Sequence, residues 1–321
     1  MAGERRHARL STPPPPLMAF ERELFLRSIG GAPALGGVAP QLARAMRDVS
    51  FRAGETIHRA GDFTRLIHFV THGEVELTTE GSETWRLVAP AVIGALDVNL
   101  RRPFSRTATA LTDVRALVLG ADDWFEVLDD NFEYASAAML TQAADVHRLH
   151  LTLSPNGAFP DPPPQSDDDD AHALNVQERT LALRLVSCFQ FAGIQALATL
   201  AIGAEERSLD RGQRLFTIDD PAPSFFVVAR GTIRIQREDP EIRARFGPGS
   251  IVGGASAPSF AAQQYTAEAE SRAVVLEIRR EDLIDALEDH VEMVHAMFAG
   301  LGIERERIMN ERARLGKLGA R

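Results

Sequence analysis

Arg106 is followed by four small residues in the stretch Arg-Thr-Ala-Thr-Ala, residues 106–110. The planar guanidinium of an arginine can pair with two oxygens of a phosphate or a carboxylate at once. Small neighbouring side chains would let such an anion approach the backbone. The stretch therefore predicts an anion site at Arg106, which a ligand, another anion or a protein carboxylate could fill. The alternative is an ordinary barrel-rim arginine paired with a carboxylate such as Asp97.

Other residue types that could do chemistry stand in less specific settings. His147 and His150 have helical spacing, but no carboxylate or cysteine completes a metal site, so a solvated helix face is expected. His68 and His72 alternate on an expected strand and are interpreted as plain strand residues. Cys188, the only cysteine, lies in an apolar run and is expected in the core, because a reactive thiol needs an electropositive setting.

Catalytic signatures are not apparent in the sequence. No serine or cysteine stands in a nucleophile motif, and glycine pairs such as the one at 253–254 do not form a phosphate loop. The run Asp167–Asp170 lacks the alternating oxygens and the turn glycine of a calcium loop, so a solvated charge run is expected. We expect no enzyme, no cofactor and no metal site.

Composition bounds the class of protein. The chain has 321 residues, a formal net charge of −10 and a pI near 5.4. Its length suggests about two domains, and its acidity argues against a broad nucleic-acid interface. No window is apolar over the roughly 18 residues that a membrane span needs, and the N-terminus lacks a secretory apolar segment. A cytoplasmic protein is expected.

Two proline-rich stretches divide the chain. The first lies near the N-terminus, and the second combines prolines with the aspartate run; neither composition can build a core. The predicted organisation is a disordered arm (1–18), a first domain (19–153), a linker (154–172) and a second domain that ends in a long helix (173–321).

The two predicted domains repeat each other. Gly54 and Gly73 recur 158 positions later as Gly212 and Gly231. After one inserted residue the offset becomes 159, and Gly94 then corresponds to Gly253. Each repeat reads as a helical segment, short strands joined by glycine turns, and a long helical pattern. We expect a mainly β fold with flanking helices, made of two jelly-roll barrels.

These landmarks resemble the cyclic-nucleotide-binding domain family, which includes the catabolite activator protein and the regulatory subunits of cyclic-AMP-dependent protein kinase. The resemblance rests on the order of glycines around residues 51–75, followed by the stretches Ile-Gly-Ala-Leu-Asp-Val and Arg-Thr-Ala-Thr-Ala. It covers residues of about 20–150 and, more weakly, 176–314.

In that family a short helix and an arginine hold the cyclic phosphate, and a glutamate after a glycine accepts the ribose hydroxyl. Carried over, the resemblance places the phosphate site of the first repeat at Gly94, Ala95, Leu96, Arg106, Thr107, Ala108 and Thr109. Ala95 replaces the family's glutamate, and Asp97 stands two residues further on. Arg101 and Arg102 would lie close to this pocket.

The second repeat departs further from the family pattern. Its counterpart residues are Gly253, Gly254, Tyr265 and Thr266. Gly254 stands where the glutamate belongs, Tyr265 stands where Arg106 stands, and Glu268 would repel a phosphate. Residues 253–270 contain no arginine or lysine. This pocket is expected not to bind a cyclic nucleotide in the family's way.

The last helical pattern carries an apolar stripe at Val291, Val294, Phe298 and Leu301. The stripe could pack on its own barrel, join the two repeats within one chain, form a homodimer, or dock on a protein partner. The pattern continues to the end of the sequence, so no helix-turn-helix domain is expected.

These sequence features support two hypotheses about function. The preferred hypothesis is a non-enzymatic regulatory or scaffolding protein with two degenerate pockets, which acts through contacts with an unknown protein partner, without nucleic acid or membrane. The alternative is a cAMP or cGMP sensor that uses only the pocket at Arg106 and moves the helical segment 122–150.

Overall fold

The computed structural model describes residues 18–29, 38–63, 65–153, 172–238, 241–253 and 262–318. Several sequence predictions concern residues outside these ranges. They are the expected arm and the expected linker, each except for its last residue, together with the aspartate run and Gly254.

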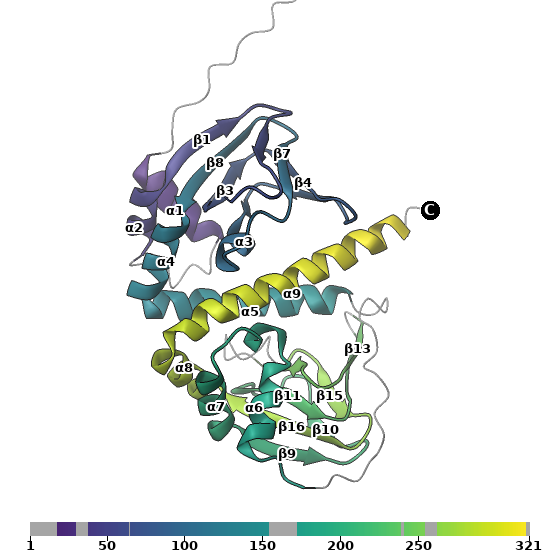
Figure 1. The fold of residues 1–321 in the computed structure, drawn as a ribbon. Helices are drawn as coiled ribbons and strands as arrows, with labels where there is room; N and C mark the ends of the chain where they lie inside the picture. The colour runs from purple at the N-terminus through teal and green to yellow at the C-terminus, as the bar shows by residue number, and fades with distance from the viewer. Residues whose placement is uncertain are drawn as a thin grey trace, which may run out of the picture.

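The first domain is a barrel of two four-stranded antiparallel sheets with flanking helices (Figure 1). The sheets have the strand orders β1-β8-β3-β6 and β2-β7-β4-β5. The strands are β1 (Arg47–Phe51), β2 (Thr56–His58), β3 (Leu66–His72), β4 (Glu74–Thr78), β5 (Trp85–Val88), β6 (Ala91–Ile93), β7 (Thr107–Ala110) and β8 (Val114–Gly120). The helices are α1 (Ala19–Ile29), α2 (Ala39–Ala45), α3 (Ala95–Asn99), α4 (Ala121–Asp130) and α5 (Phe132–Leu153).

The second domain repeats this architecture with the sheet orders β14-β11-β16-β9 and β10-β15-β12-β13. Its strands are β9 (Glu205–Leu209), β10 (Arg214–Phe216), β11 (Ser224–Arg230), β12 (Ile233–Arg237), β13 (Ile242–Phe246), β14 (Ile251–Val252), β15 (Thr266–Ala269) and β16 (Ala273–Arg279). Its helices are α6 (Val176–Arg184), the 3-10 helix η2 (Ser187–Phe189), α7 (Ile194–Gly203), α8 (Arg280–Asp289) and α9 (Val291–Leu318). The predicted pair of jelly-roll barrels is confirmed.

The predicted repeat is also visible element by element. Strands β3 and β11 start 158 positions apart, and β8 and β16 start 159 apart, as do α4 and α8. The glycine turns keep the same role in both copies. Gly73 (φ +96°) and Gly231 (φ +78°) adopt a left-handed backbone, and a side chain on either would collide with main-chain atoms where β8 or β16 begins, at Asp113 or at Arg272 and Ala273.

The long helical pattern at the end of each repeat is not one helix. It breaks at Asn131 and at His290, whose backbones leave the helical region with ψ of 71° in both cases. The Asn131 side chain donates to the carbonyl oxygen of Val127 at 3.0 Å and so satisfies one of the acceptors that the end of α4 leaves open. The break lets α5 and α9 leave their own barrels.

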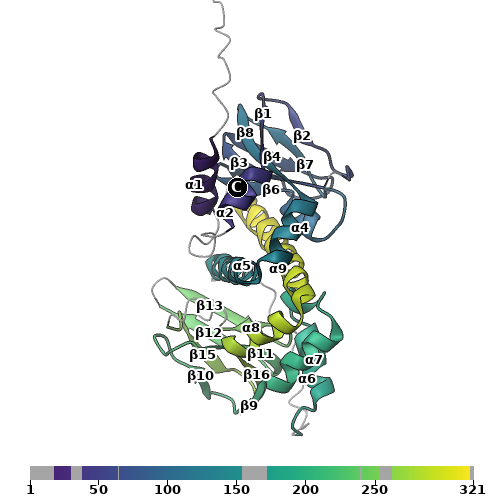
Figure 2. The same cartoon turned by 90° about the vertical axis from the view of Figure 1, so that its left-hand side faces the viewer.

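Helices α5 and α9 lie side by side between the two domains (Figures 1 and 2). The arrangement is reciprocal: α9 of domain 2 packs on α3 of domain 1, and α5 of domain 1 lines a cavity with residues of domain 2. One apolar cluster therefore runs through both helices and both domains. None of the described helices combines the length and apolar character that a membrane-spanning segment requires.

Two glycines of α9 allow this close packing. Gly300 lies against the backbone of Ser187 and Cys188 in η2, and Gly302 lies against the side chain of Leu96 in α3. A methyl group on Gly300 would meet main-chain atoms, which cannot rotate away as a side chain can. The position of α9 between the domains thus depends on small residues where it crosses its neighbours.

Substitution of Gly300 tests this crossing. Gly300→Ala should destabilise the protein by about 1–3 kcal/mol, because α9 must move away from η2, and thermal unfolding should show a lower midpoint. Gly203→Ala is the matched control, since its new methyl group would come no closer than 3.8 Å to Asp282 and would improve helix propensity. Equal midpoints for the two variants would show that α9 is not packed this tightly.

Candidate functional site

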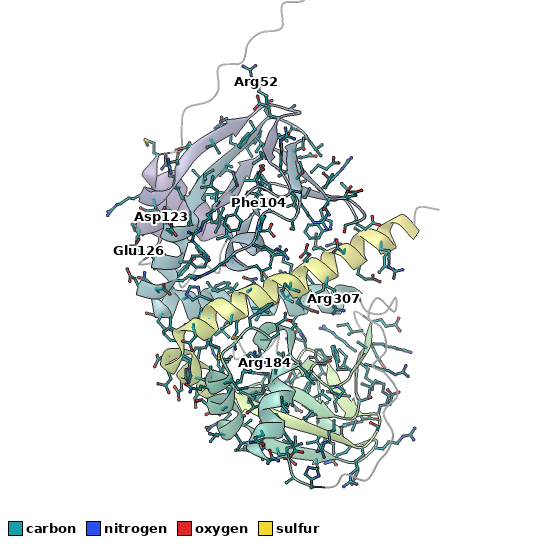
Figure 3. The ribbon with its side chains drawn as sticks, viewed as in Figure 1. Arg52, Phe104, Asp123, Glu126, Arg184 and Arg307 are labelled. Atoms are coloured by element: carbon teal, nitrogen blue, oxygen red, sulfur yellow. The ribbon has the colours of Figure 1, made fainter. Side chains whose placement is uncertain are left out.

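The predicted phosphate site of domain 1, residues 94–109, forms a cassette with a defined local structure. Gly94 precedes the short helix α3 with φ of +84°. A side chain there would collide with the carbonyl oxygen of Leu66 and the ring of Phe104, so glycine is required. Phe104, labelled in Figure 3, thus lies beside the start of α3. Ala95 opens the helix, and the Leu96 side chain lies against Gly302 of α9.

Asp97 is used within the cassette and does not pair with Arg106. Its carboxylate, 7% exposed, accepts from Nε of Arg102 at 2.7 Å and from the backbone N–H of Ser105 at 3.2 Å. The Ser105 hydroxyl lies 3.3 Å from the same carboxylate. Asp97 therefore ties α3 to the loop that leads to Arg106. The alternative in which Asp97 is the partner of Arg106 is wrong.

Arg106 is 5% exposed and bound by protein groups on several sides. Its Nη1 donates to the carbonyl oxygen of Glu83 at 2.6 Å, and its Nη2 donates to Oδ1 of Asn310 at 2.8 Å. The guanidinium lies 3.8 Å from the centre of the Trp85 ring, within cation–π range. Glu306 lies 4.0 Å from its Nε. The expected anion site is thus occupied by groups of the chain itself.

The last turns of α9 supply the distant part of this site. Oδ1 of Asn310 also accepts from Nε1 of Trp85 at 3.2 Å, and Glu306 accepts from Nη2 of Arg102 at 3.2 Å. Neither residue is near Arg106 in the sequence, and sequence analysis missed both. The only signal was the polar continuation of the final helical pattern beyond its apolar stripe. A protein carboxylate near Arg106 was among the predicted alternatives, and Glu306 is that carboxylate.

Burial governs the electrostatics of the two arginines. It lowers the pKa of Arg106, although Glu306 and Asp97 act in the opposite direction. Burial also opposes the charge of Arg102, but hydrogen bonds to Asp97 and Glu306 outweigh it and raise the pKa of Arg102. A buried guanidinium needs partners because an unpaired buried charge is costly. Here α9 provides part of that compensation.

The small residues after Arg106 build strand β7. Ala108 is fully buried and points into the barrel core, while Thr107 and Thr109 alternate with it. The Thr107 hydroxyl accepts from the N–H of Ala60 at 3.0 Å, and Thr109 pairs with Glu76 of β4. These three residues therefore form part of the barrel wall.

The counterpart site in domain 2 contains a tyrosine in place of the arginine. Tyr265 is 1% exposed, and its hydroxyl accepts from the N–H of Gly253 at 2.8 Å. The same hydroxyl lies 3.2 Å from Nε2 of His147 on α5. The Thr266 hydroxyl accepts from the N–H of Ile218, and Glu268 pairs with Arg234. The described part of this site offers a neutral hydroxyl where domain 1 has a cation.

The two sites correspond through the repeat. The offset of 159 relates Arg106 to Tyr265, and it also relates His147 on α5 to Glu306 on α9. Each cassette residue therefore contacts the equivalent position of the other domain's last helix. The contact between Arg106 and Glu306 is charged. The contact between Tyr265 and His147 is neutral, because burial lowers the pKa of His147 to about 4.

Several sequence predictions are settled by this arrangement. The predicted solvated face at His147 is wrong, because its ring packs against Tyr265 with centroids 5.9 Å apart; the side chain of His150 is outside the described part. Cys188 is confirmed as a core thiol, and burial raises its pKa to about 12. His68 lies on a strand as predicted and is buried there, whereas His72 is exposed.

The apolar stripe of the last helix is used within the chain. Val294, Phe298 and Leu301 are buried in the cluster that joins the domains, and Val291 begins α9. The Phe298 ring meets Trp124 of α4 edge-on at 6.0 Å. Of the predicted alternatives, packing inside one chain accounts for this stripe.

A cavity of about 320 Å³ lies on the domain 2 side of α5 and α9. Its described lining is mostly apolar and includes Val146, Phe246 and Met297. Arg307, labelled in Figure 3, also lines it and donates to Glu304 at 2.6 Å. The described residues contain no cluster of three or more histidine, cysteine or acidic side chains that could hold a metal ion.

The family model for the cyclic nucleotide-binding domain matches residues 48–131 and 206–290, one match in each barrel. The chain belongs to the cyclic nucleotide-binding domain family. The two family matches include strands of both sheets in each domain, together with α4 and α8. A search of curated proteins finds no match.

Solved structures similar to this chain include three named proteins. A cAMP-bound PfPKA-R is 16% identical with a TM-score of 0.38, covering 93% of this chain and 91% of that one. The regulatory subunit of a cAMP-independent protein kinase A from Trypanosoma brucei is 16% identical with a TM-score of 0.34, covering 79% and 81%. A cyclic nucleotide-binding-like protein from Brucella abortus is 25% identical with a TM-score of 0.31, covering 35% and 98%. These likenesses assign no ligand to this member of the family.

The buried hydroxyl of Tyr265 should contribute measurably to stability. Tyr265→Phe leaves the N–H of Gly253 without its acceptor, which should cost about 1–3 kcal/mol and lower the thermal midpoint. The other tyrosine, Tyr134, makes no hydrogen bond through its hydroxyl to any described residue, so Tyr134→Phe should change the midpoint little. If both variants unfold like the wild type, the Tyr265 hydroxyl does not hold the domain 2 cassette.

Proposed function

We propose that this chain is a non-enzymatic regulatory or scaffolding protein that acts through protein contacts, and that its own helix α9 closes the anion site of domain 1. One observation carries the proposal. Arg106, the residue that would bind a cyclic phosphate, is bound instead by Asn310 at 2.8 Å and faces Glu306 at 4.0 Å. A phosphate would have to displace these groups and would be repelled by the carboxylate.

The cassette also lacks a group for the ribose. Ala95 stands in place of the family's glutamate, and the Asp97 carboxylate already accepts from Arg102 and Ser105. Loss of a hydrogen bond to a charged group costs roughly 1.5–3 kcal/mol, or about one to two decades of affinity. Closure by α9 and loss of the ribose partner therefore weaken nucleotide binding together.

Domain 2 supports this role as a structural copy. Its described cassette residues present the neutral hydroxyl of Tyr265, which the chain itself satisfies through Gly253. The domain contributes α9, whose last turns reach domain 1. We propose that domain 2 serves to position this helix.

Regulation would follow from movement of α9. Its release from domain 1 would uncover Glu306 and Asn310, which bind Arg102 and Arg106 in the closed arrangement. A protein partner that binds this polar face of α9 would shift the population toward the open state, because it binds that state better.

A second function is favoured by one specific observation. Gly94 precedes the short helix α3 with a left-handed backbone and Arg106 is buried, which supports a phosphate site in domain 1. A cAMP or cGMP sensor would use this cassette after α9 leaves, and the nucleotide would compete with Glu306 and Asn310 for Arg106.

Calorimetric titration with cAMP and with cGMP separates the two functions. The wild type should give no binding heat and no shift of its melting temperature, because α9 holds Arg106. The variant Glu306→Ala/Asn310→Ala should acquire weak nucleotide binding, because its guanidinium is available. Adding Arg106→Ala to that variant should abolish the binding.

Arg86→Ala is the matched control, since this arginine is 72% exposed and lies outside the cassette. It should behave like the background into which it is placed. Micromolar binding by the wild type that Arg106→Ala removes would establish the sensor and overturn closure by α9.

A further inference from the structure

Two histidines lie side by side in the interior of domain 1. His58 of β2 is 8% exposed, His68 of β3 is 4% exposed, and their ring centroids are 5.8 Å apart. The repeat offset of 158 places Phe216 and Phe226 at the same positions in domain 2. Those rings are also 5.8 Å apart. The barrel therefore accommodates two phenylalanines here, and packing does not explain two imidazoles.

Hydrogen bonding does not fully explain the histidines either. The Nδ1 atoms of both rings are buried, and neither has a hydrogen-bond partner among the described residues. The main chain of Arg106 lies near His58 and favours its protonated form. A buried polar atom without a partner destabilises a fold, whereas a phenylalanine at the same place would not. Domain 1 thus carries a polar pair that its sister domain replaces with apolar rings.

Burial keeps the pair neutral at physiological pH. It lowers the pKa of His58 to about 4, against weaker opposing effects from Asp97 of α3, from Asp62 in the turn after β2 and from the main chain of Arg106. Burial also lowers the pKa of His68 to about 4, and His58 adds to this effect. These are the charged and titratable groups of the neighbouring elements that act on the two rings.

The pair is connected to the site that α9 closes. The His58 ring stacks on Phe104 with centroids 3.8 Å apart and planes 18° apart. Phe104 packs against Gly94 at the start of α3, and the main chain of Arg106 acts on the pKa of His58. A change at His58 therefore reaches the start of α3 through Phe104, and it acts next to the main chain of Arg106.

We propose that the His58–His68 pair is a proton-sensitive latch, which releases the cassette of domain 1 and with it α9 when both rings take up protons. Two adjacent buried cations repel each other, and hydration in an opened barrel relieves the repulsion. The inference rests on the proposed closure of the Arg106 site by α9.

The direction of the pH effect follows from linkage. In the closed state the two rings have a pKa of about 4, and in an open, hydrated state they approach the ordinary value of 6.5. The open state therefore binds more protons between these values, and the closed state is lost as pH falls from 6.5 towards 4. At pH 5, each histidine should shift the equilibrium roughly 30-fold toward the open state.

Trp85 offers a direct reporter of the latch, because its indole donates to Asn310 of α9. The chain has two tryptophans, so Trp124→Phe leaves Trp85 as the single tryptophan. Its emission should change between pH 7 and pH 4.5 while far-UV circular dichroism shows intact secondary structure. His58→Phe/His68→Phe, which copies the pair of domain 2, should remove that change.

Further variants test whether protonation of this histidine pair causes the fluorescence change. His58→Gln/His68→Gln, which also cannot titrate, should remove the change if the larger phenylalanines disturb folding. His147→Phe removes another histidine whose pKa is lowered by burial and should leave the change in place. A transition that persists in both double variants, or a folded wild type without a transition, would overturn the latch.

The closure itself is tested separately at pH 7.5. Glu306→Ala/Asn310→Ala should change the Trp85 emission at that pH without any proton uptake. If this variant changes the emission but the histidine variants do not alter the pH response, only the latch fails. If Trp85 does not respond to this variant, the closure proposed above fails as well.

Discussion

The contact between the Arg106 guanidinium and the last turns of α9 is the interaction on which the arrangement of domain 1 and α9 depends. A guanidinium that is 5% exposed must be paired, and two of the four groups that surround it lie about 200 residues away in the chain. That requirement fixes the end of α9 against the first barrel. The crossing at Gly300 and Gly302 fixes the middle of the same helix.

Duplication of the barrel produced two similar contacts with different chemistry. Arg106 faces Glu306 in one, and Tyr265 faces His147 in the other, at equivalent positions of the repeat. The neutral pair can stay buried because hydrogen bonds satisfy it. The charged pair carries a desolvation penalty and depends on every partner being present. Domain 1 is therefore the half of the molecule in which a change of partner or protonation can alter the structure.

The sequence predicts the fold well because the signals for it are local or repeated. Glycines with left-handed backbones and alternating strands recur at a constant offset, and in the structure Gly94 precedes α3 while Arg106 and Tyr265 precede the equivalent strands β7 and β15. For the partner of Arg106, the sequence predicted only the type of group, a protein carboxylate among other anions. Asp97, the nearby carboxylate, turns out to hold Arg102 and Ser105.

The reciprocal helix arrangement was not predictable from local patterns. His147 and Glu306 look like ordinary polar positions on helices, since neither has a partner within one or two turns. The helix break at Asn131, where the sequence reads as one continuous pattern, redirects α5 toward the second domain. Contacts between distant segments depend on such redirection, which periodicity does not reveal.

The most direct test of the account is a double-mutant cycle of unfolding free energies with Arg106→Ala, Asn310→Ala and the combined variant. The two residues are hydrogen-bonded at 2.8 Å, so the cycle should give a coupling of about 1–3 kcal/mol. Additive effects, with a coupling near zero, would mean that α9 does not hold Arg106 in solution and would contradict closure of the domain 1 site.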